Sequence, residues 1–357
     1  MPGSRELILI FGAGATRGAL EKQLLEKQLP PPPLDKDFFE IAGQLRGRRT
    51  GKLAARVIND VFKLYGRVNG IGLEQYFQDI ETRAEIGQFA KTQNQPKDWG
   101  KRKADLEELI RRVLLHTTCD FDVSPAKSLS SDSHATILRR LQRKDTVITF
   151  NYDTVIEESV PQERQIWKPR DGYGVLAGGI NNEWAKNWCA KRSINSNTNS
   201  MIHVLKLHGS LNWTLNRNKA VRLKPRPYVV RSRGTEPVFD RCSILPPGWH
   251  KRISVNPYKN LWREGRLRLE RCSSLAIIGY SLPETDLLAR ALFAEICRLR
   301  AARKNYLAHL YLADPSELVK NKFVELFIPA LGPKGRVYRY QDIKELSAAW
   351  RKHAPRR

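Results

Sequence analysis

Paired cysteines, long apolar runs and an export signal are all absent from this sequence of 357 residues. Its five cysteines are scattered and none belongs to a C-x-x-C pair, so we expect reduced thiols and no zinc or other metal site. No apolar run reaches the length of a transmembrane helix. The N-terminus lacks the basic region and long apolar stretch of a secretory signal. These absences predict a soluble protein of the cytoplasm.

Acidic residues are scarce, because 62 lysines and arginines face only 37 aspartates and glutamates, which gives a formal charge of +25. From Arg217 to Arg233 there are seven basic residues and no acidic one. Such a field attracts polyanions, which include DNA, an acidic partner protein and a substrate that carries phosphates. A solvated surface has the same composition, and charge alone assigns no element to a DNA groove.

Short apolar segments that end in polar or glycine-rich residues predict the strands of a parallel sheet. The segments are Glu6–Phe11, Asp145–Phe150, Ile202–Leu207, Leu275–Ile278 and Leu307–Ala313. Helical stretches alternate with them, including Ser133–Gln142 and a helix expected to open at Ser281, in a capping pattern, and to reach Arg300. The alternation predicts an α/β protein with a Rossmann-like, three-layer parallel sheet, which binds ligands beyond the carboxyl ends of its strands.

The stretch after the first strand and helix has helical periodicity instead. Two groups of apolar residues recur at helical spacing: Leu53, Val57, Ile58, Val61 and Tyr65, and then Leu106, Leu109, Ile110, Val113 and Leu114. We therefore expect an all-helical module inserted at residues 35–131. Residues 1–34 and 132–345 then form the Rossmann-like catalytic domain, and residues 346–357 form a basic tail.

A glycine-rich turn follows the first predicted strand, in the order Gly12, Ala13, Gly14, Ala15 and Thr16. Glycines at such a place permit a tight turn and let backbone N–H groups approach a pyrophosphate at a helix N-terminus. The pattern is incomplete, because Arg17 stands where a dinucleotide-binding motif has its third glycine. An ordinary tight turn would have the same composition.

Three polar side chains at two other strand ends are candidates for chemistry. Asn151 and Asp153 follow one strand, and His208 follows the next, immediately before Gly209. An amide can hold a ribose hydroxyl or a water molecule, and a histidine can accept a proton near neutral pH. Asn and Asp are equally the favoured caps of helices, and a single histidine is more often structural.

Taken together, the motifs resemble those of the sirtuin-like superfamily. The resemblance rests on G-A-G-A-T from Gly12, T-F-N-Y-D from Thr149, L-H-G-S-L-N-W from Leu207 and I-I-G-Y-S-L from Ile277, in that order. Phe150 replaces the usual glutamine of the second motif, and Tyr280 replaces the usual threonine of the fourth. The resemblance covers about the first 30 residues and residues 135–320, and it leaves out the helical insertion.

The resemblance implies a site for NAD⁺ and assigns roles to residues of the motifs. Asn151 and His208 would be catalytic. Residues 12–16 would hold the pyrophosphate, and Gly279, Tyr280 and Ser281 the phosphates or the adenosine ribose. Asp314, at the end of the last predicted strand, would bind the adenosine ribose hydroxyls. The nicotinamide would lie near Asp37, Phe38 and Asp153, since Pro33–Phe38 loosely matches a proline-aspartate-phenylalanine motif of sirtuins.

One departure from the family pattern indicates the subtype. Protein-deacylating sirtuins carry two C-x-x-C pairs that hold zinc, and this chain has none. It therefore looks more like the sirtuin-like NAD⁺ hydrolases of bacterial anti-phage defence, which deplete NAD⁺ by releasing nicotinamide. Such an activity would be controlled by self-assembly into a homo-oligomer or by a separate partner such as a HerA-type ATPase.

Two other functions remain open from the sequence. The chain could be an NAD⁺-dependent deacylase or ADP-ribosyl transferase, in which case an acceptor protein would be required. It could also be a module without catalysis that binds nucleic acid through its basic patches. In that case DNA binding would depend on salt and NAD⁺ would not be consumed.

Overall fold

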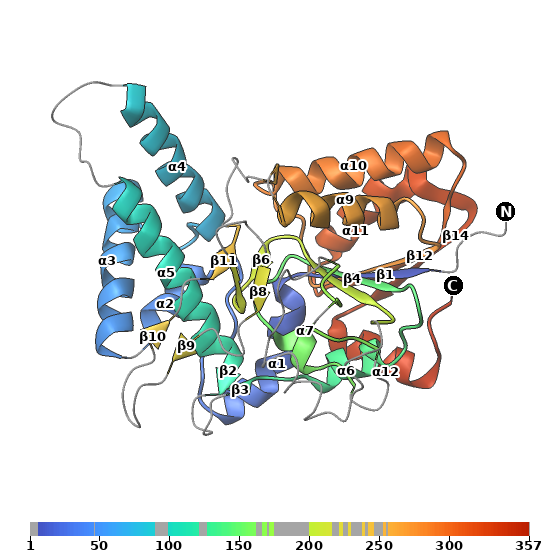
Figure 1. Ribbon diagram of the computed structural model, residues 1–357, viewed down its shortest axis with the longest axis horizontal. Coiled ribbons are helices and arrows are strands. Elements are labelled where there is room, and N and C mark those ends of the chain that lie inside the picture. Colours follow the sequence, from blue (N-terminus) through green and yellow to red (C-terminus); the bar gives the residue numbers. More distant parts are fainter. Residues whose placement is uncertain are drawn as a thin grey trace.

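A six-stranded parallel sheet organises the protein in its computed structural model (Figure 1). The strands are β1 (Leu7–Phe11), β4 (Thr146–Thr149), β5 (His203–Lys206), β12 (Ser274–Ile278), β13 (Leu307–Ala313) and β14 (Leu331–Tyr340). Their spatial order is β14-β13-β12-β1-β4-β5, and every neighbouring pair is parallel. This is the strand order of a Rossmann fold, so the predicted fold class is confirmed. The order reverses between β1 and β12, where such sheets bind their ligands.

Helices cover both faces of this sheet (Figure 1). One face carries α1 (Ala13–Glu26), α6 (Asp132–Leu138) and α12 (Ile343–Lys352), and the other carries α9 (Tyr258–Leu269), α10 (Leu287–Ala302) and α11 (Glu317–Phe327). The short helices α7 (Val155–Glu158) and η2 (Ile328–Ala330) complete this part. Because helices cover both of its faces, β1 consists entirely of apolar residues, and all five are buried.

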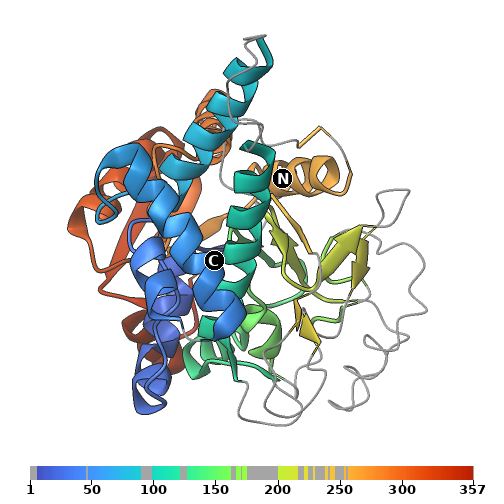
Figure 2. The ribbon, with the colours of Figure 1, turned by 90° about the vertical axis from the view of Figure 1, so that its left-hand side faces the viewer.

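Four further helices stand together beside the sheet: α2 (Phe38–Gln44), α3 (Arg48–Tyr65), α4 (Leu73–Phe89) and α5 (Trp99–Thr118). Figure 2 views the molecule from their side. Their apolar faces form a hydrophobic cluster of their own, separate from the core around the sheet. It contains Leu53, Val57 and Val61 of α3, and Leu106 and Leu109 of α5. The periodicity that predicted these two helices thus marked their buried faces.

The structure describes residues 6–45, 47–89, 99–120, 127–161, 166–169, 171–174, 200–215, 221–223, 228–229, 238–239, 242–245, 253–254 and 256–356. The remaining strands are short antiparallel pairs: β2 (Cys119–Asp120) with β3 (Lys127–Ser128), β6 (Gly209–Ser210) with β11 (Ser243–Ile244), β7 (Trp213–Leu215) with β8 (Val221–Leu223), and β9 (Tyr228–Val229) with β10 (Val238–Phe239). Cys189 and most of the basic stretch Arg217–Arg233 lie outside the described residues. Within these ranges, no helix has the length and apolar character that crossing a membrane requires.

Two sequence-based expectations about helices differ from the structure. The helix expected to open at Ser281 begins only at Leu287, because Leu282 has a positive φ of 49° that a helix cannot contain, and Asp286 caps α10 instead. Residues 343–352, which include the start of the expected basic tail, form α12, where Leu346 and Trp350 are buried. Beyond α12, the backbone N–H and C=O of Arg356 bond to Tyr311 and Ser274.

Candidate active site

The carboxyl ends of the strands meet along one edge of the sheet, and the polar motifs of the sequence lie there. The last residues of β1, β4 and β12 are register partners, since Phe11 pairs with both Thr149 and Ile278. Ile278 in turn pairs with Ala313 of β13, and Thr149 with Lys206 of β5. Each candidate motif begins within two positions of one of these strand ends, so a single edge brings together segments that lie about 300 residues apart.

The glycine turn after β1 packs tightly against the turn after β12. Gly12 N–H donates to Ile278 O over 3.0 Å, and Gly14 N–H donates to Gly279 O over 2.9 Å. Gly279 has a φ of +57°, and a Cβ there would lie 2.0 Å from the backbone nitrogen of Ala15. Only glycine fits that position. The close approach joins the first and fourth motifs at the point where the strand order reverses.

Thr16 links the first motif to the second through its hydroxyl group. Asn151 Nδ2 donates to Thr16 Oγ1 over 3.0 Å and to Gly12 O over 2.9 Å, and Thr16 Oγ1 donates to Asp153 Oδ2 over 3.1 Å. All three polar side chains are nearly inaccessible to solvent. Among the described residues, no donor lies within hydrogen-bond distance of the amide oxygen of Asn151. That oxygen is therefore the acceptor that the Asn151 side chain can offer to a ligand.

Asp153 also fixes the start of the next helix, since its Oδ1 accepts the backbone N–H of Val155 over 3.0 Å. Burial raises the pKa of Asp153 above the usual value of a carboxyl group, while Lys206 and the hydrogen bonds from Val155 and Thr16 act in the opposite direction. The N-cap of α7 is Thr154, so Asp153 does not cap the helix; its side chain closes a local turn before α7 and accepts the Thr16 hydroxyl as well.

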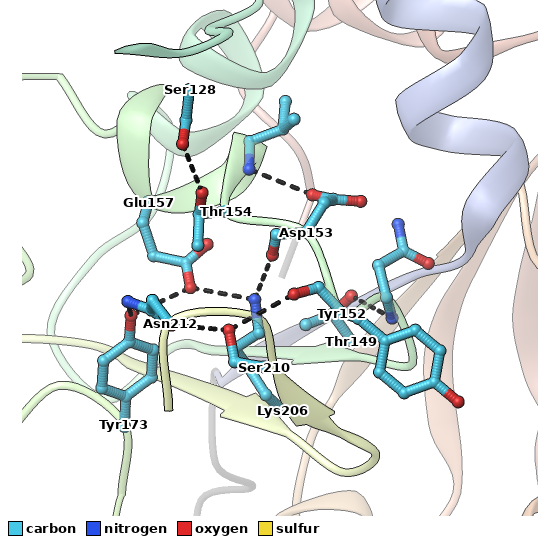
Figure 3. A network of polar contacts seen from close by, with 12 residues as sticks. Ser128, Thr149, Tyr152, Asp153, Thr154, Glu157, Tyr173, Lys206, Ser210 and Asn212 are labelled. Atoms are coloured by element: carbon cyan, nitrogen blue, oxygen red, sulfur yellow. Dashed lines mark hydrogen bonds and ion pairs between the residues drawn. The ribbon is translucent and has the colours of Figure 1, made fainter. Parts of the chain in front are cut away.

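A buried polar network supports the backbone of this segment from below (Figure 3). Lys206, which is fully buried, contacts the carbonyl oxygen of Asp153 and lies 3.0 Å from Glu157 Oε1. Tyr173 donates to the same Glu157 oxygen over 3.0 Å, and Asn212 donates to Tyr173 over 3.3 Å. A buried lysine requires such a partner, because an unpaired charge in the core is costly. The network therefore holds the residues after β4 in one conformation.

His208 lies at the equivalent place on β5, with its imidazole among aromatic rings. Its ring centroid is 5.1 Å from that of Phe150 and 6.2 Å from those of Tyr152 and Trp262. Its Nε2 atom is 3.6 Å from Asp286 Oδ2. Gly209, which follows, has a φ of +86° and packs against Ser243 and Tyr258, so the chain turns sharply after the histidine.

Asn151 and His208 reach this edge with side chains that contact different elements. Asn151 bonds to α1 and the turn before it, whereas His208 contacts Trp262 of α9 and Asp286 at the start of α10. Phe150 joins the two regions, because it precedes Asn151 and its ring contacts both His208 and Tyr280. Phe150 and Tyr280, the two departures from the family motifs, stack with their centroids 4.3 Å apart.

The other residues predicted to bind the ligand differ in their burial and in their contacts. Asp37 forms an ion pair with Arg17 of α1, whereas Phe38 is 1% exposed in the core of the helical cluster. Ser281 is exposed beside the glycine turns. Asp314 is half-buried after β13, where its Oδ1 accepts Ser316 N–H over 2.9 Å and burial raises its pKa. No group of three or more potential metal ligands occurs within the described residues.

Asp286 is a residue of this edge that the sequence analysis missed. It is 1% exposed, accepts a hydrogen bond from Tyr280 over 2.8 Å and caps α10 by accepting Ala289 N–H over 3.4 Å. The signal for the cap was present, since an aspartate immediately before the apolar run L-L-A is a typical helix start. Its contact with His208 joins residues 78 positions apart, which no local pattern reveals.

Comparisons with known proteins identify the family. The model of the SIR2-like domain matches residues 145–326, just over half of the chain. Similar solved structures include a mutant Sir2 homologue with ADP-ribose, at 13% identity over 98% of this chain and 92% of that chain, with a TM-score of 0.41. Another is a mutant Sir2 with a p53 peptide and NAD, at 12% identity over 97% and 92%, with a TM-score of 0.36. No curated protein matches the sequence. On the domain match, the chain belongs to the sirtuin-like family with a SIR2-like domain, which indicates an enzyme that uses NAD.

Proposed function

We propose that the protein hydrolyses NAD⁺ to nicotinamide and ADP-ribose. The observation that carries this proposal is the hydrogen-bonded group of Asn151, Thr16 and Asp153, which joins two distant motifs at the carboxyl edge of the sheet. The histidine of a third motif follows the neighbouring strand at the same level. An amide and an imidazole at the ligand-binding edge of a Rossmann-like sheet suit the cleavage of a nucleotide's glycosidic bond.

In this proposal the first turn and α1 receive the pyrophosphate. Ala13 is exposed at the N-terminus of α1, where the helix dipole favours an anion, while the N–H groups of Gly14 and Ala15 are already paired with carbonyl oxygens. Gly279, Tyr280 and Ser281 would lie along the phosphates and the adenosine ribose, and Asp314 would accept hydrogen bonds from that ribose. Asp37, Phe38 and Asp153 would then border the nicotinamide.

The chemistry requires little covalent help from the protein. Nicotinamide leaves as a neutral molecule when the bond between C1′ and its ring nitrogen breaks and the electron pair stays on nitrogen. The ribose then has oxocarbenium character, and the oxygen of a water molecule bonds to C1′. His208 would accept the proton of that water or of a ribose hydroxyl, and Asn151 would orient the ribose and the water.

Hydrolysis is favoured over transfer to a protein because the sequence has no C-x-x-C pairs for the zinc module of a deacylase.

We also propose the biological role that this chemistry suits, the depletion of NAD⁺ in bacterial anti-phage defence. Assembly with itself or with a partner such as a HerA-type ATPase would control it. Contact with DNA through the basic surface is compatible with the charge of +25.

The test is the release of nicotinamide and ADP-ribose from NAD⁺ by the purified protein, with and without DNA. Asn151→Ala and His208→Ala should each lower kcat by about 100-fold or more, as expected for the loss of a group that acts in the transition state. Asn59→Ala and His353→Ala, at exposed positions, are the matched controls and should keep full activity.

Circular dichroism melting would show that the variants fold. Full turnover by either site variant would refute the assigned roles. ADP-ribose found only on an acceptor protein, with none free in solution, would identify a transferase instead.

A further inference from the structure

Asp286 is held in place from two sides. Its Oδ1 accepts Ala289 N–H over 3.4 Å, which makes it the N-cap of α10, and its Oδ2 accepts the Tyr280 hydroxyl over 2.8 Å. Thr285, immediately before it, donates a hydrogen bond to Glu74 of α4. Tyr280 in the turn after β12, the first turn of α10 and the helical cluster therefore all fix the segment that carries this carboxylate.

The carboxylate faces the imidazole of His208 at close range. Asp286 Oδ2 lies 3.6 Å from His208 Nε2, and both side chains are buried. Such contacts are often long without substrate and shorten when the substrate is bound. A carboxylate beside one ring nitrogen favours the tautomer that has its proton there, which leaves Nδ1 as the nitrogen that can accept a proton.

We propose that Asp286 is a positioning residue for His208. Its carboxylate keeps the proton on Nε2 and stabilises the imidazolium that forms when Nδ1 takes a proton from the attacking water or a ribose hydroxyl. That proton passes to bulk water after the products leave. The inference rests on the proposed NAD⁺ hydrolysis, and it assigns a catalytic purpose to a residue that also caps a helix and accepts the Tyr280 hydroxyl.

Other ionisable groups near Asp286 and His208 also affect the electrostatics of these two side chains. Tyr280 and Tyr152 both interact electrostatically with Asp286 and with Glu74, and Arg290 of α10 acts on Tyr280 from the other side. Tyr258 of α9 completes the set through Tyr152. Because both phenols have pKa values well above the ordinary value through burial, they stay neutral, and the Asp286 carboxylate faces the His208 imidazole over 3.6 Å.

The substitution Asp286→Asn tests the charge alone, since asparagine caps helices as well as aspartate and has nearly the same shape. We expect kcat to fall by about 30-fold or more with KM changed by less than about 3-fold, because the loss affects proton transfer and not substrate binding. The acid limb of the pH profile of kcat should move to lower pH, because His208 loses the anion that favours its charged form. Asp286→Glu should restore part of the rate.

Asp342→Asn is the matched control. Asp342 caps α12 in the same way, by accepting Glu345 N–H over 2.8 Å, so its replacement should leave both the rate and the pH profile unchanged. A readout that needs no turnover is the titration of His208 by NMR. The pKa of His208 should be lower in Asp286→Asn than in the unmodified protein.

If the unmodified protein is active and Asp286→Asn has the same rate, pH profile and His208 titration, the inference is overturned and the proposed function stays intact. A wild-type protein that releases no nicotinamide would overturn the proposed function, and the NMR titration would still decide whether Asp286 governs the imidazole. If Asp286→Asn fails to fold, Tyr280→Phe removes one anchor of the carboxylate and should lower kcat by about 3-fold to 10-fold. Unchanged kcat in a folded Tyr280→Phe would then count against the positioning role.

Discussion

Thr16 is the residue on which the candidate site depends most, because its hydroxyl both accepts from Asn151 and donates to Asp153. Replacing it with valine, which has nearly the same shape, removes both bonds, so that the buried side chains of Asn151 and Asp153 each lose one hydrogen-bond partner. We expect Thr16→Val to lower the free energy of unfolding by about 2 kcal/mol and nicotinamide release by about 10-fold or more.

The matched variant Thr16→Ser keeps the hydroxyl and should retain most of the stability and activity. Urea denaturation and a nicotinamide assay on both variants would check the prediction. Equal behaviour of the serine and valine variants would show that the hydroxyl does not organise the site.

A second residue makes stability depend on pH. His134 of α6 is fully buried, its ring centroid is 5.1 Å from that of Phe11, and burial lowers its pKa from 6.5 to about 3. The folded state thus keeps His134 neutral, whereas the unfolded chain protonates it below pH 6.5. Its contribution to stability is complete above pH 6.5 and is lost as the pH falls towards 3, by about 1.4 kcal/mol per pH unit.

Urea denaturation at pH 7.5 and pH 5.5 would measure this effect. His134→Leu should lose less stability between the two pH values than the unmodified protein does, because it removes the group that takes up the proton. The exposed His353→Leu should behave like the unmodified protein. The same pH dependence in all three proteins would contradict the assignment to His134.

At the scale of elements, the turn after β1 packs closely against the turn after β12. Gly279→Ala would introduce a Cβ 2.0 Å from a backbone atom at a positive φ, and we expect it to cost about 3 kcal/mol or more. Gly66→Ala is the control, since Gly66 also has a positive φ, of 68°, but no atom within 4 Å of the added Cβ.

The control substitution should cost only about 1 kcal/mol, which is the conformational part alone. Thermal or urea unfolding of both variants would separate the two contributions. Similar losses for Gly279→Ala and Gly66→Ala would mean that the two turns move apart easily.

The strands and helices that could be predicted from the sequence are those whose burial gives their own residues a recognisable apolar pattern. β1, β4, β5, β12 and β13 are largely buried and therefore mainly apolar, which revealed them. β14 is an edge strand, half-exposed and rich in glycine and basic residues, so its sequence L-G-P-K-G-R-V-Y-R-Y did not resemble a buried strand. The sequence did not predict α12 either, because basic residues surround its buried Leu346 and Trp350.

The candidate site likewise has residues that the sequence could indicate and contacts that it could not. Asn151 and His208 could be proposed from the sequence because each lies two residues beyond the end of a mainly apolar strand. The bond from Thr16 to Asp153 and the contact of His208 with Asp286 join positions far apart in the chain, and only the packing of the strands and helices creates them.

At the scale of the whole molecule, the helical cluster contacts the sheet domain at the same edge as the candidate site. Arg17 of α1 pairs with Asp37, which begins α2, and Thr285 beside Asp286 donates to Glu74 of α4. Both contacts lie next to motif residues. The cluster is therefore placed to border a ligand held at the strand ends, and a change in its position would reach the loops of both motifs.

A crystal structure of the variant His208→Ala grown with NAD⁺, which we expect to be inactive, tests the proposed binding of NAD⁺ most directly. The account predicts one dinucleotide across the strand ends, with its pyrophosphate beside residues 12–16 and its nicotinamide ribose within hydrogen-bond distance of Asn151. A dinucleotide bound at another face of the protein, or at this edge with its nicotinamide ribose turned away from Asn151, would contradict it.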